Sequence, residues 1–211
     1  MKPIRLMAGF FTVGIWTLLS RLMGFVRDIM IASYLGTGPI AEAFLVAFSL
    51  PNLFRRFFAE GAFNMAFVPM FSKKLEAGDD ALKFAQDAFV GMTFILTIFT
   101  VVGIIFMPLL VTAMASGFLG DTRFDLAVYY GRIAFPYILF ISLSALLSGV
   151  LNATGRFVAA AAAPVLLNVI FIGFMIMAAI VWTWSESATQ SAENAVRLYV
   201  GDWLAIAVPV A

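Results

Sequence analysis

Long apolar runs dominate the chain, and short polar stretches separate them. A helix that crosses a bilayer needs about 20 mostly apolar residues. On this criterion the pattern predicts membrane helices over six ranges, 8–33, 41–72, 84–116, 124–152, 157–183 and 196 onward. The expected fold class is therefore all-α, a polytopic membrane helix bundle of about six transmembrane helices.

The last apolar range is shorter than a full membrane span. Residues 196–211 number 16 and include Asp202 and Pro209, whereas a crossing needs about 17 to 25 residues. We therefore expect the chain to be a fragment that is truncated within its sixth helix. The loops between the ranges are short, so residues 1–211 are expected to form one transmembrane lobe without a soluble domain.

Composition indicates a membrane protein and argues against nucleic-acid binding, metal sites, cofactors and enzyme activity. Of the 211 residues, 63% are hydrophobic and 12% are charged, about half the charged share of a soluble domain. The net charge of +1 offers no basic field for nucleic acid. The chain has no cysteine and no histidine, and it has no phosphate-cradling glycine loop, so we expect no metal, no cofactor and no enzyme activity.

Lys and Arg are unevenly divided between the connecting segments. The positive-inside rule places the more basic set of loops in the cytoplasm. One side receives six basic residues and the other receives two: Lys2, Arg5, Lys73, Lys74, Lys83 and Arg156 against Arg123 and Arg197. The sequence therefore predicts a cytoplasmic N-terminus.

Five arginines fall inside the expected helices: Arg21, Arg27, Arg55, Arg56 and Arg132. Each costs at least about 2.5 to 3.5 kcal/mol at a helix centre, so each should face a polar cavity or a partner. In the first helix a 100° step per residue gathers one polar face, made of Thr17, Ser20, Arg21, Gly24, Arg27 and Asp28.

This polar face has two interpretations. In one, Arg21, Arg27 and Asp28 form a closed ion-pair cluster that only joins helices. In the other, two arginines against one carboxylate leave a surplus positive charge that binds an anion. On the second interpretation, Arg21→Ala and Arg27→Ala should abolish function while membrane abundance is nearly unchanged.

The second helix carries a similar polar stripe. Residues spaced by seven, three and four positions share one face of an unbroken helix, and these are Glu42, Ser49, Asn52, Arg56, Glu60 and Asn64. Arg55 lies about 100° from that stripe. Pro51 can kink the helix, so either Arg55 or Arg56 could face inward, and both could instead reach the cytoplasmic interface.

Small and amide side chains appear in the later helices. Ser142, Ser144, Ala145, Ser148 and Gly149 allow close contact between helices, so we interpret them as packing residues. Asn152 and Asn168 either line a cavity or bond a neighbouring backbone, and the pattern does not separate these two roles.

Several strings together closely resemble the MurJ (MviN) lipid II flippases of bacteria. The match covers almost the whole chain, and the combination is specific. The strings are SRLMGFVRD at 20–28, LPNLFRR at 50–56, FAEGAF at 58–63, AFVP at 66–69, FPYILF at 135–140, GVLN at 149–152, GRF at 155–157 and APVLLN at 163–168.

The resemblance implies a member of the multidrug/oligosaccharidyl-lipid/polysaccharide exporter superfamily, in which two six-helix lobes surround a central cavity. This chain resembles the N-terminal lobe, so its partners would be the missing C-terminal lobe, membrane lipids and lipid II, an undecaprenyl-pyrophosphate-linked disaccharide-pentapeptide. The family moves lipid II from the inner to the outer leaflet of the bacterial cytoplasmic membrane for peptidoglycan synthesis.

The resemblance also assigns roles to residues. Positions that match the family's substrate-binding residues are Ser20, Arg21, Arg27, Asp28 and Arg55, and positions expected to support the cavity or gate are Glu42, Asn52, Arg56 and Glu60. One departure is Glu42-Ala43-Phe44, where the family usually has Asp-Ala-Phe. A further cavity arginine of the family comes from the second lobe.

Two rival functions remain. A small-cation or drug antiporter of the same superfamily predicts a cavity rich in carboxylates and aromatic residues. A membrane scaffold without transport predicts that neutral replacements of Arg21, Arg27 and Arg55 are tolerated.

Overall fold

The chain is almost entirely helical. The computed structural model describes residues 3–56, 62–185 and 192–210. Its α-helices are α1 (Pro3–Leu35), α2 (Pro39–Arg55), α3 (Ala62–Ala77), α4 (Ala81–Ile105), α5 (Met107–Met114), α6 (Thr122–Ala134), α7 (Tyr137–Ala153), α8 (Phe157–Ser185) and α9 (Ala192–Val210). The described residues contain no strand, and the expected all-α class is confirmed.

Two of the six expected ranges are divided in the described structure. The range 84–116 contains α4 and α5, and 124–152 contains α6 and α7. The range 41–72 contains α2 and α3, which lie on either side of residues 57–61, outside the described part of the chain. Proline explains both divisions, because Pro108 is the second residue of α5 and Pro136 directly precedes α7. Proline has no backbone N–H to donate and its ring clashes with the preceding turn. The apolar pattern located these ranges but could not show where each helix is broken.

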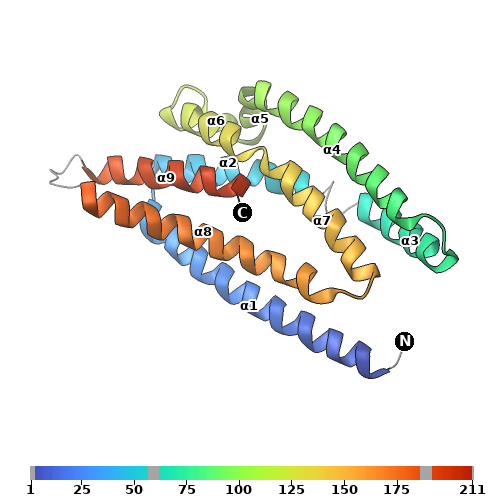
Figure 1. The fold of residues 1–211 in the computed structure, drawn as a ribbon. Coiled ribbons are helices and arrows are strands. Elements are labelled where there is room, and N and C mark those ends of the chain that lie inside the picture. Colours follow the sequence, from blue (N-terminus) through green and yellow to red (C-terminus); the bar gives the residue numbers. More distant parts are fainter. Residues whose placement is uncertain (1–2, 57–61, 186–191, 211) are drawn as a thin grey trace.

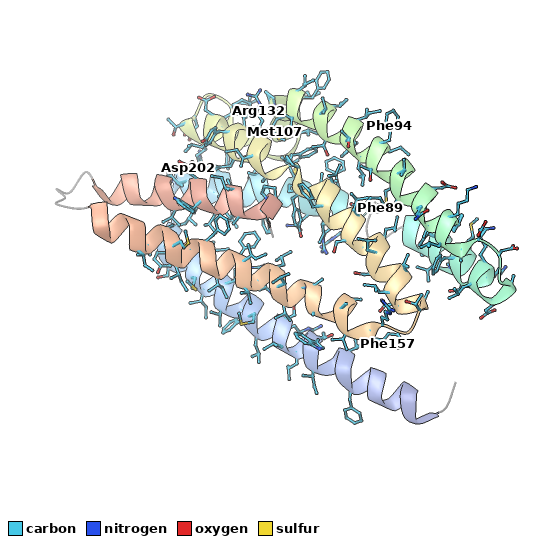
Figure 2. All side chains as sticks on the ribbon, in the orientation of Figure 1. Phe89, Phe94, Met107, Arg132, Phe157 and Asp202 are labelled. Carbon is cyan, nitrogen blue, oxygen red and sulfur yellow. The ribbon has the colours of Figure 1, made fainter. Side chains whose placement is uncertain are left out.

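Three helical segments are long and apolar enough to cross a membrane within the described part of the chain: Ala81–Ile105, Thr122–Ala153 and Phe157–Ile180. Helices α1, α2 and α3 interrupt their apolar runs with charged residues. Large apolar side chains are exposed on α1 and α4, including Phe25 and Phe94, and Figure 2 shows Phe94 on the outside of α4. An apolar outer surface suits a bundle whose solvent is lipid.

The helices form a bundle whose two ends have different connections (Figure 1). Helix α1 packs along α8, and α2 packs against α6. The start of α1 and the α3–α4 and α7–α8 turns lie toward one end, and the α1–α2 and α5–α6 connections lie toward the other. The end with the first three features carries Lys73, Lys74, Lys83 and Arg156.

The turn between α7 and α8 depends on Gly155. Its φ of 77° lies in the left-handed region, where glycine has no steric penalty. The N–H of Arg156 donates to the carbonyl of Leu151 at 2.8 Å, and the N–H of Gly155 donates to that of Asn152 at 3.1 Å. These bonds close the end of α7, so that the chain reverses and α8 begins beside it.

Candidate functional site

A cavity of about 1160 Å³ lies between α1, α2, α7 and α8. It is close to the α7–α8 turn, because Asn152 at the end of α7 and Ala160 at the start of α8 both line it. Its polar lining residues are Ser20, Arg21, Arg27, Asn52, Arg55, Tyr137, Ser144, Ser148, Asn152 and Asn168. The four helices therefore bring together polar groups that are far apart in the sequence.

Three arginines line this cavity, namely Arg21 and Arg27 from α1 and Arg55 from α2. Among the described lining residues there is no aspartate or glutamate. A guanidinium is a planar cation with several N–H donors. The lining therefore offers cations and neutral hydrogen-bonding groups, an arrangement that suits an anionic ligand.

Arg27 is held by groups from two helices. Its Nε and Nη2 donate to Oδ1 of Asp28 at 3.0 and 2.8 Å, and its Nη1 donates to Oδ1 of Asn168 on α8 at 2.9 Å. The ring of Phe171, also on α8, lies 5.7 Å from Cζ of Arg27. Arg27 thus contributes to the α1–α8 contact as well as to the cavity wall.

Arg21 has a different environment, although it lies on the same face of α1. Its side chain is exposed, and the described residues give it no hydrogen bond or ion pair. Among the described residues, Asp28 forms an ion pair with Arg27 and not with Arg21. The three-residue cluster considered from the sequence is therefore not closed in the described structure, because Arg21 stands outside it.

Helix α2 places Arg55, and not Arg56, in the cavity wall. Pro51 lies inside this helix, where it cannot donate to the carbonyl one turn earlier. The next residue, Asn52, lines the cavity and donates from Nδ2 to the carbonyl of Phe48 at 3.0 Å. Arg56 is exposed at the C-terminal end of α2.

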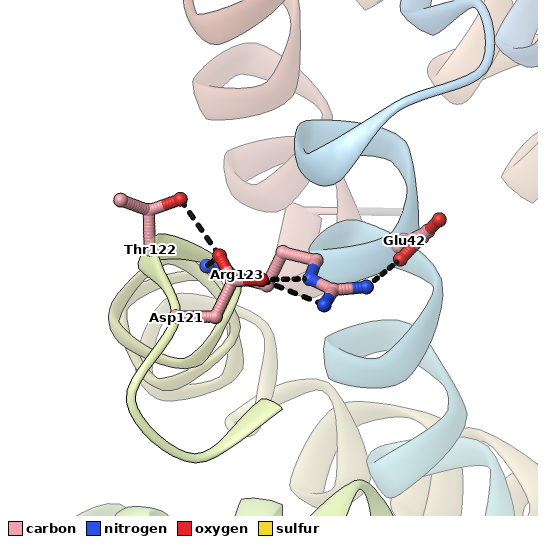
Figure 3. A network of polar contacts seen from close by, with 4 residues as sticks. All are labelled: Glu42, Asp121, Thr122 and Arg123. Atoms are coloured by element: carbon pink, nitrogen blue, oxygen red, sulfur yellow. Dashed lines mark hydrogen bonds and ion pairs between the residues drawn. The ribbon is translucent and has the colours of Figure 1, made fainter. Parts of the chain in front are cut away.

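The polar stripe expected on the second helix does not form one surface. Glu42 lies at the other end of α2 from Arg55, where it accepts a hydrogen bond from Nη1 of Arg123 at 2.8 Å (Figure 3). It is not a lining residue of the cavity. The physical reason is distance along the helix axis, because Glu42 and the lining residue Asn52 are ten residues, and so about 15 Å, apart on α2. Glu60 lies outside the described residues.

Asp121 completes the group around Arg123. The backbone N–H of Arg123 donates to Oδ1 of Asp121, and its Nε donates to Oδ2 at 2.7 Å. The backbone bond and then the side-chain bond from Arg123 lower the pKa of the Asp121 carboxyl below its ordinary value. This network links the start of α6 to α2, away from the cavity.

Sequence reasoning did not assign several lining residues to the cavity. Ser144 and Ser148 were expected only to pack helices, yet both line the cavity. Asn168 does both things that the sequence left open, since it lines the cavity and donates from Nδ2 to the carbonyl of Ser20 at 3.0 Å. Arg132 is exposed on α6 and does not line the cavity. Proximity to other helices decides these roles, and no local pattern encodes it.

No group of His, Cys, Asp or Glu that could hold a metal ion occurs in the described part of the chain. The cavity lining offers guanidinium, amide and hydroxyl groups. These groups bind phosphate through charge-assisted hydrogen bonds.

Comparison with known proteins agrees with this picture. The family model described as lipid II flippase MurJ matches residues 31–211. A probable lipid II flippase MurJ of Rhizobium tropici is 47% identical over 173 residues, which are 80% of this chain and 32% of the relative. The lipid II flippase MurJ of Burkholderia cenocepacia is also 47% identical, over 80% of this chain and 33% of the relative.

A more distant match is the probable lipid II flippase MurJ of Vibrio cholerae, which is 34% identical over 80% of this chain and 34% of the relative. The chain thus spans about a third of the length of these relatives. Because the family model covers most of its residues, this membrane protein belongs to the lipid II flippase MurJ family.

Proposed function

We propose that the chain is the N-terminal lobe of a flippase that moves lipid II across the bacterial cytoplasmic membrane, and that its cavity binds the pyrophosphate of that lipid. One observation carries the proposal. Three arginines line the cavity, and no carboxylate occurs among its described lining residues.

Arginine suits this ligand for two reasons. Its planar guanidinium presents paired N–H groups that match the oxygens of a phosphate, and it does not lose its charge. A pyrophosphate has two adjacent phosphate groups, so arginines from α1 and α2 can each contact one of them. The serines and Asn152 of the lining can then bind the sugar portion through neutral hydrogen bonds.

The proposed orientation places the start of α1 in the cytoplasm and the chain in the inner membrane. Support comes from the positions of Lys73, Lys74, Lys83 and Arg156 at the end where α1 starts, because positive charges favour the cytoplasmic side. The cavity lies close to the α7–α8 turn at this same end. The lipid would then enter from the inner leaflet.

A single lobe does not complete the transport cycle that we propose. The matched relatives are about three times as long as the chain, which supports a second lobe that closes the cavity from the other side. Transport by alternating access would follow when the two lobes rock around the bound pyrophosphate. In this account the protein is a transporter and not an enzyme.

The rival antiporter receives no support from the lining. A site for small cations or cationic drugs needs carboxylates to balance the charge of its ligand. The described lining residues include three arginines and no aspartate or glutamate, which is the opposite charge from the one that such a site needs.

Adjacent arginines provide a test with a matched control. We expect full-length protein with Arg55→Ala to fail to restore growth of cells depleted of their lipid II flippase, because a lining cation is lost. Arg56→Ala, which removes an exposed arginine outside the lining, should restore growth. Membrane abundance of both variants is measured alongside. Growth with Arg55→Ala at normal abundance would show that the pyrophosphate assignment is wrong.

A further inference from the structure

Asn168 occupies an unusual place in the cavity wall, because it is only 5% exposed and yet uses both ends of its amide. Its Nδ2 donates to the carbonyl of Ser20 at 3.0 Å, and its Oδ1 accepts from Nη1 of Arg27 at 2.9 Å. Ser20 and Arg27 are seven residues apart and so share a face of α1 two turns apart. One side chain of α8 therefore joins a backbone group and a charged group of α1.

The guanidinium of Arg27 is fixed from several directions. Asp28 engages Nε and Nη2, Asn168 engages Nη1, and the Phe171 ring lies near Cζ. A guanidinium has five N–H donors, and the described contacts use three of them. Two N–H groups, one on each terminal nitrogen, thus remain for a ligand in the cavity.

We propose that Asn168 is a positioning residue for substrate binding, which holds Arg27 so that its two remaining N–H groups meet a phosphate of the lipid. The inference rests on the proposed function and assigns different tasks to Arg27 and Arg21. Arg27 is set in place before the ligand arrives, whereas Arg21, which has no such support among the described residues, adapts to it. A group fixed in advance loses less conformational freedom on binding.

Local packing leaves room for this arrangement. Gly24 lies on α1 opposite the Asn168 amide, and a Cβ built at Gly24 would sit 3.6 Å from Nδ2. Both amide atoms of Asn168 lie within ordinary van der Waals distance of that position, so the amide packs directly against α1 at Gly24. Asn168 contacts Arg27 and not the ligand, so its effect should pass entirely through the position of that guanidinium.

The first test measures the position of Arg27 without any lipid. Full-length protein is treated with phenylglyoxal, which modifies accessible arginines, and the rates at Arg27 and Arg21 are followed by mass spectrometry. We expect slow modification of Arg27 in the wild type and a rate about tenfold higher in Asn168→Leu, with the rate at Arg21 unchanged. Thr100→Val removes a buried hydroxyl of α4 outside the cavity lining and should change neither rate.

The second test measures binding of undecaprenyl pyrophosphate in detergent, with inorganic pyrophosphate as competitor. Asn168→Leu should bind about tenfold more weakly, the loss expected for one hydrogen bond of this kind. In an Arg27→Ala background the same substitution should have almost no further effect. Additive losses would show that Asn168 acts through general packing and would overturn the inference.

A second variant keeps the proposal testable if Asn168→Leu does not fold. Asn168→Asp has nearly the same shape and retains an acceptor for Arg27, but its charge competes with the phosphate. It should keep Arg27 slow to react and still weaken pyrophosphate binding. Unchanged binding by Asn168→Asp, or a wild-type Arg27 as reactive as Arg21, would contradict the inference. Wild-type protein that binds no pyrophosphate would instead contradict the proposed function, because the reactivity test needs no ligand.

Discussion

Arg123 at the start of α6 donates from Nη1 to Oε2 of Glu42 near the start of α2, at 2.8 Å (Figure 3). Their side chains are 30% and 50% exposed. The pair joins two helices at the end of the lobe away from the arginine-lined cavity. Its partial exposure limits its strength, because water and salt screen the attraction.

The Glu42–Arg123 pair should therefore make a small contribution to stability. We expect Glu42→Gln to lower the free energy of unfolding by less than about 1 kcal/mol, and the coupling in a double-mutant cycle with Arg123→Gln to lie at about 0.2 to 1 kcal/mol. Thermal unfolding in detergent at low and high salt measures both values. A coupling of several kcal/mol that does not change with salt would show that the pair is effectively buried.

Asp121 provides a pH-dependent prediction. Its pKa is lowered in the folded protein by hydrogen bonds from Arg123. A carboxyl with a lowered folded pKa stabilises the protein above its unfolded pKa, and this stabilisation is lost as the pH falls through the folded value. The difference in stability between wild type and Asp121→Asn should thus be constant at neutral pH and disappear only below the ordinary value of 3.8. A difference that instead vanishes between pH 6 and 8 would exclude this carboxyl as its source.

Two glycines of α4 should respond in opposite ways to alanine. A Cβ at Gly103 would overlap the ring of Phe135, which is fully buried and packs against Phe54 and Phe99. Gly103→Ala should therefore destabilise the bundle by about 1 to 3 kcal/mol. Gly91 has open space around its Cβ position, so Gly91→Ala should be neutral or stabilise the helix by up to about 1 kcal/mol. Melting temperatures of the two variants test this, and equal effects would refute the packing described for Phe135.

Arg21 and Arg27 should differ in their effect on stability. The sequence alone predicts that alanine at either position leaves abundance nearly unchanged. The contacts of Arg27 with Asp28, Asn168 and Phe171 change this prediction for Arg27. Its removal should cost about 1 to 3 kcal/mol through lost charge-assisted bonds, whereas Arg21→Ala should be nearly neutral. The free energies of unfolding of the two variants, measured in parallel, give this difference. An equal loss of stability in both variants would mean that Arg21 also has a structural partner.

Much of the fold follows from the pattern of apolar residues, because a lipid environment demands long helices with internally satisfied backbones. The ranges 8–33 and 157–183 correspond to single helices α1 and α8. The break at Pro136 was not predicted, since a proline can either kink a helix or end it. Tertiary contacts decide between these outcomes, and the pattern along the chain does not contain them.

The candidate site was only partly accessible from the sequence. Helical periodicity placed Arg21 and Arg27 on one face of α1, and both line the cavity. It could not choose between Arg55 and Arg56, because the choice depends on the local turn after Pro51. It also gave no indication that Asn168 reaches Arg27, since a contact across 141 positions has no local signal. Similarly, the partner of Glu42 is set by the approach of α6 to α2.

Outward movement of lipid II is the readout closest to the role that we propose for the arginine-lined cavity. The measurement is the fraction of newly made lipid II in spheroplasts that a membrane-impermeant enzyme can cleave at the outer surface. Cells would depend on full-length protein with Arg21→Ala, Arg27→Ala or Arg55→Ala, at membrane levels matched to wild type. We expect each variant to lower this fraction about tenfold or more, since each loses a charge-assisted contact to the pyrophosphate. Wild-type accessibility in all three variants at matched levels would contradict it.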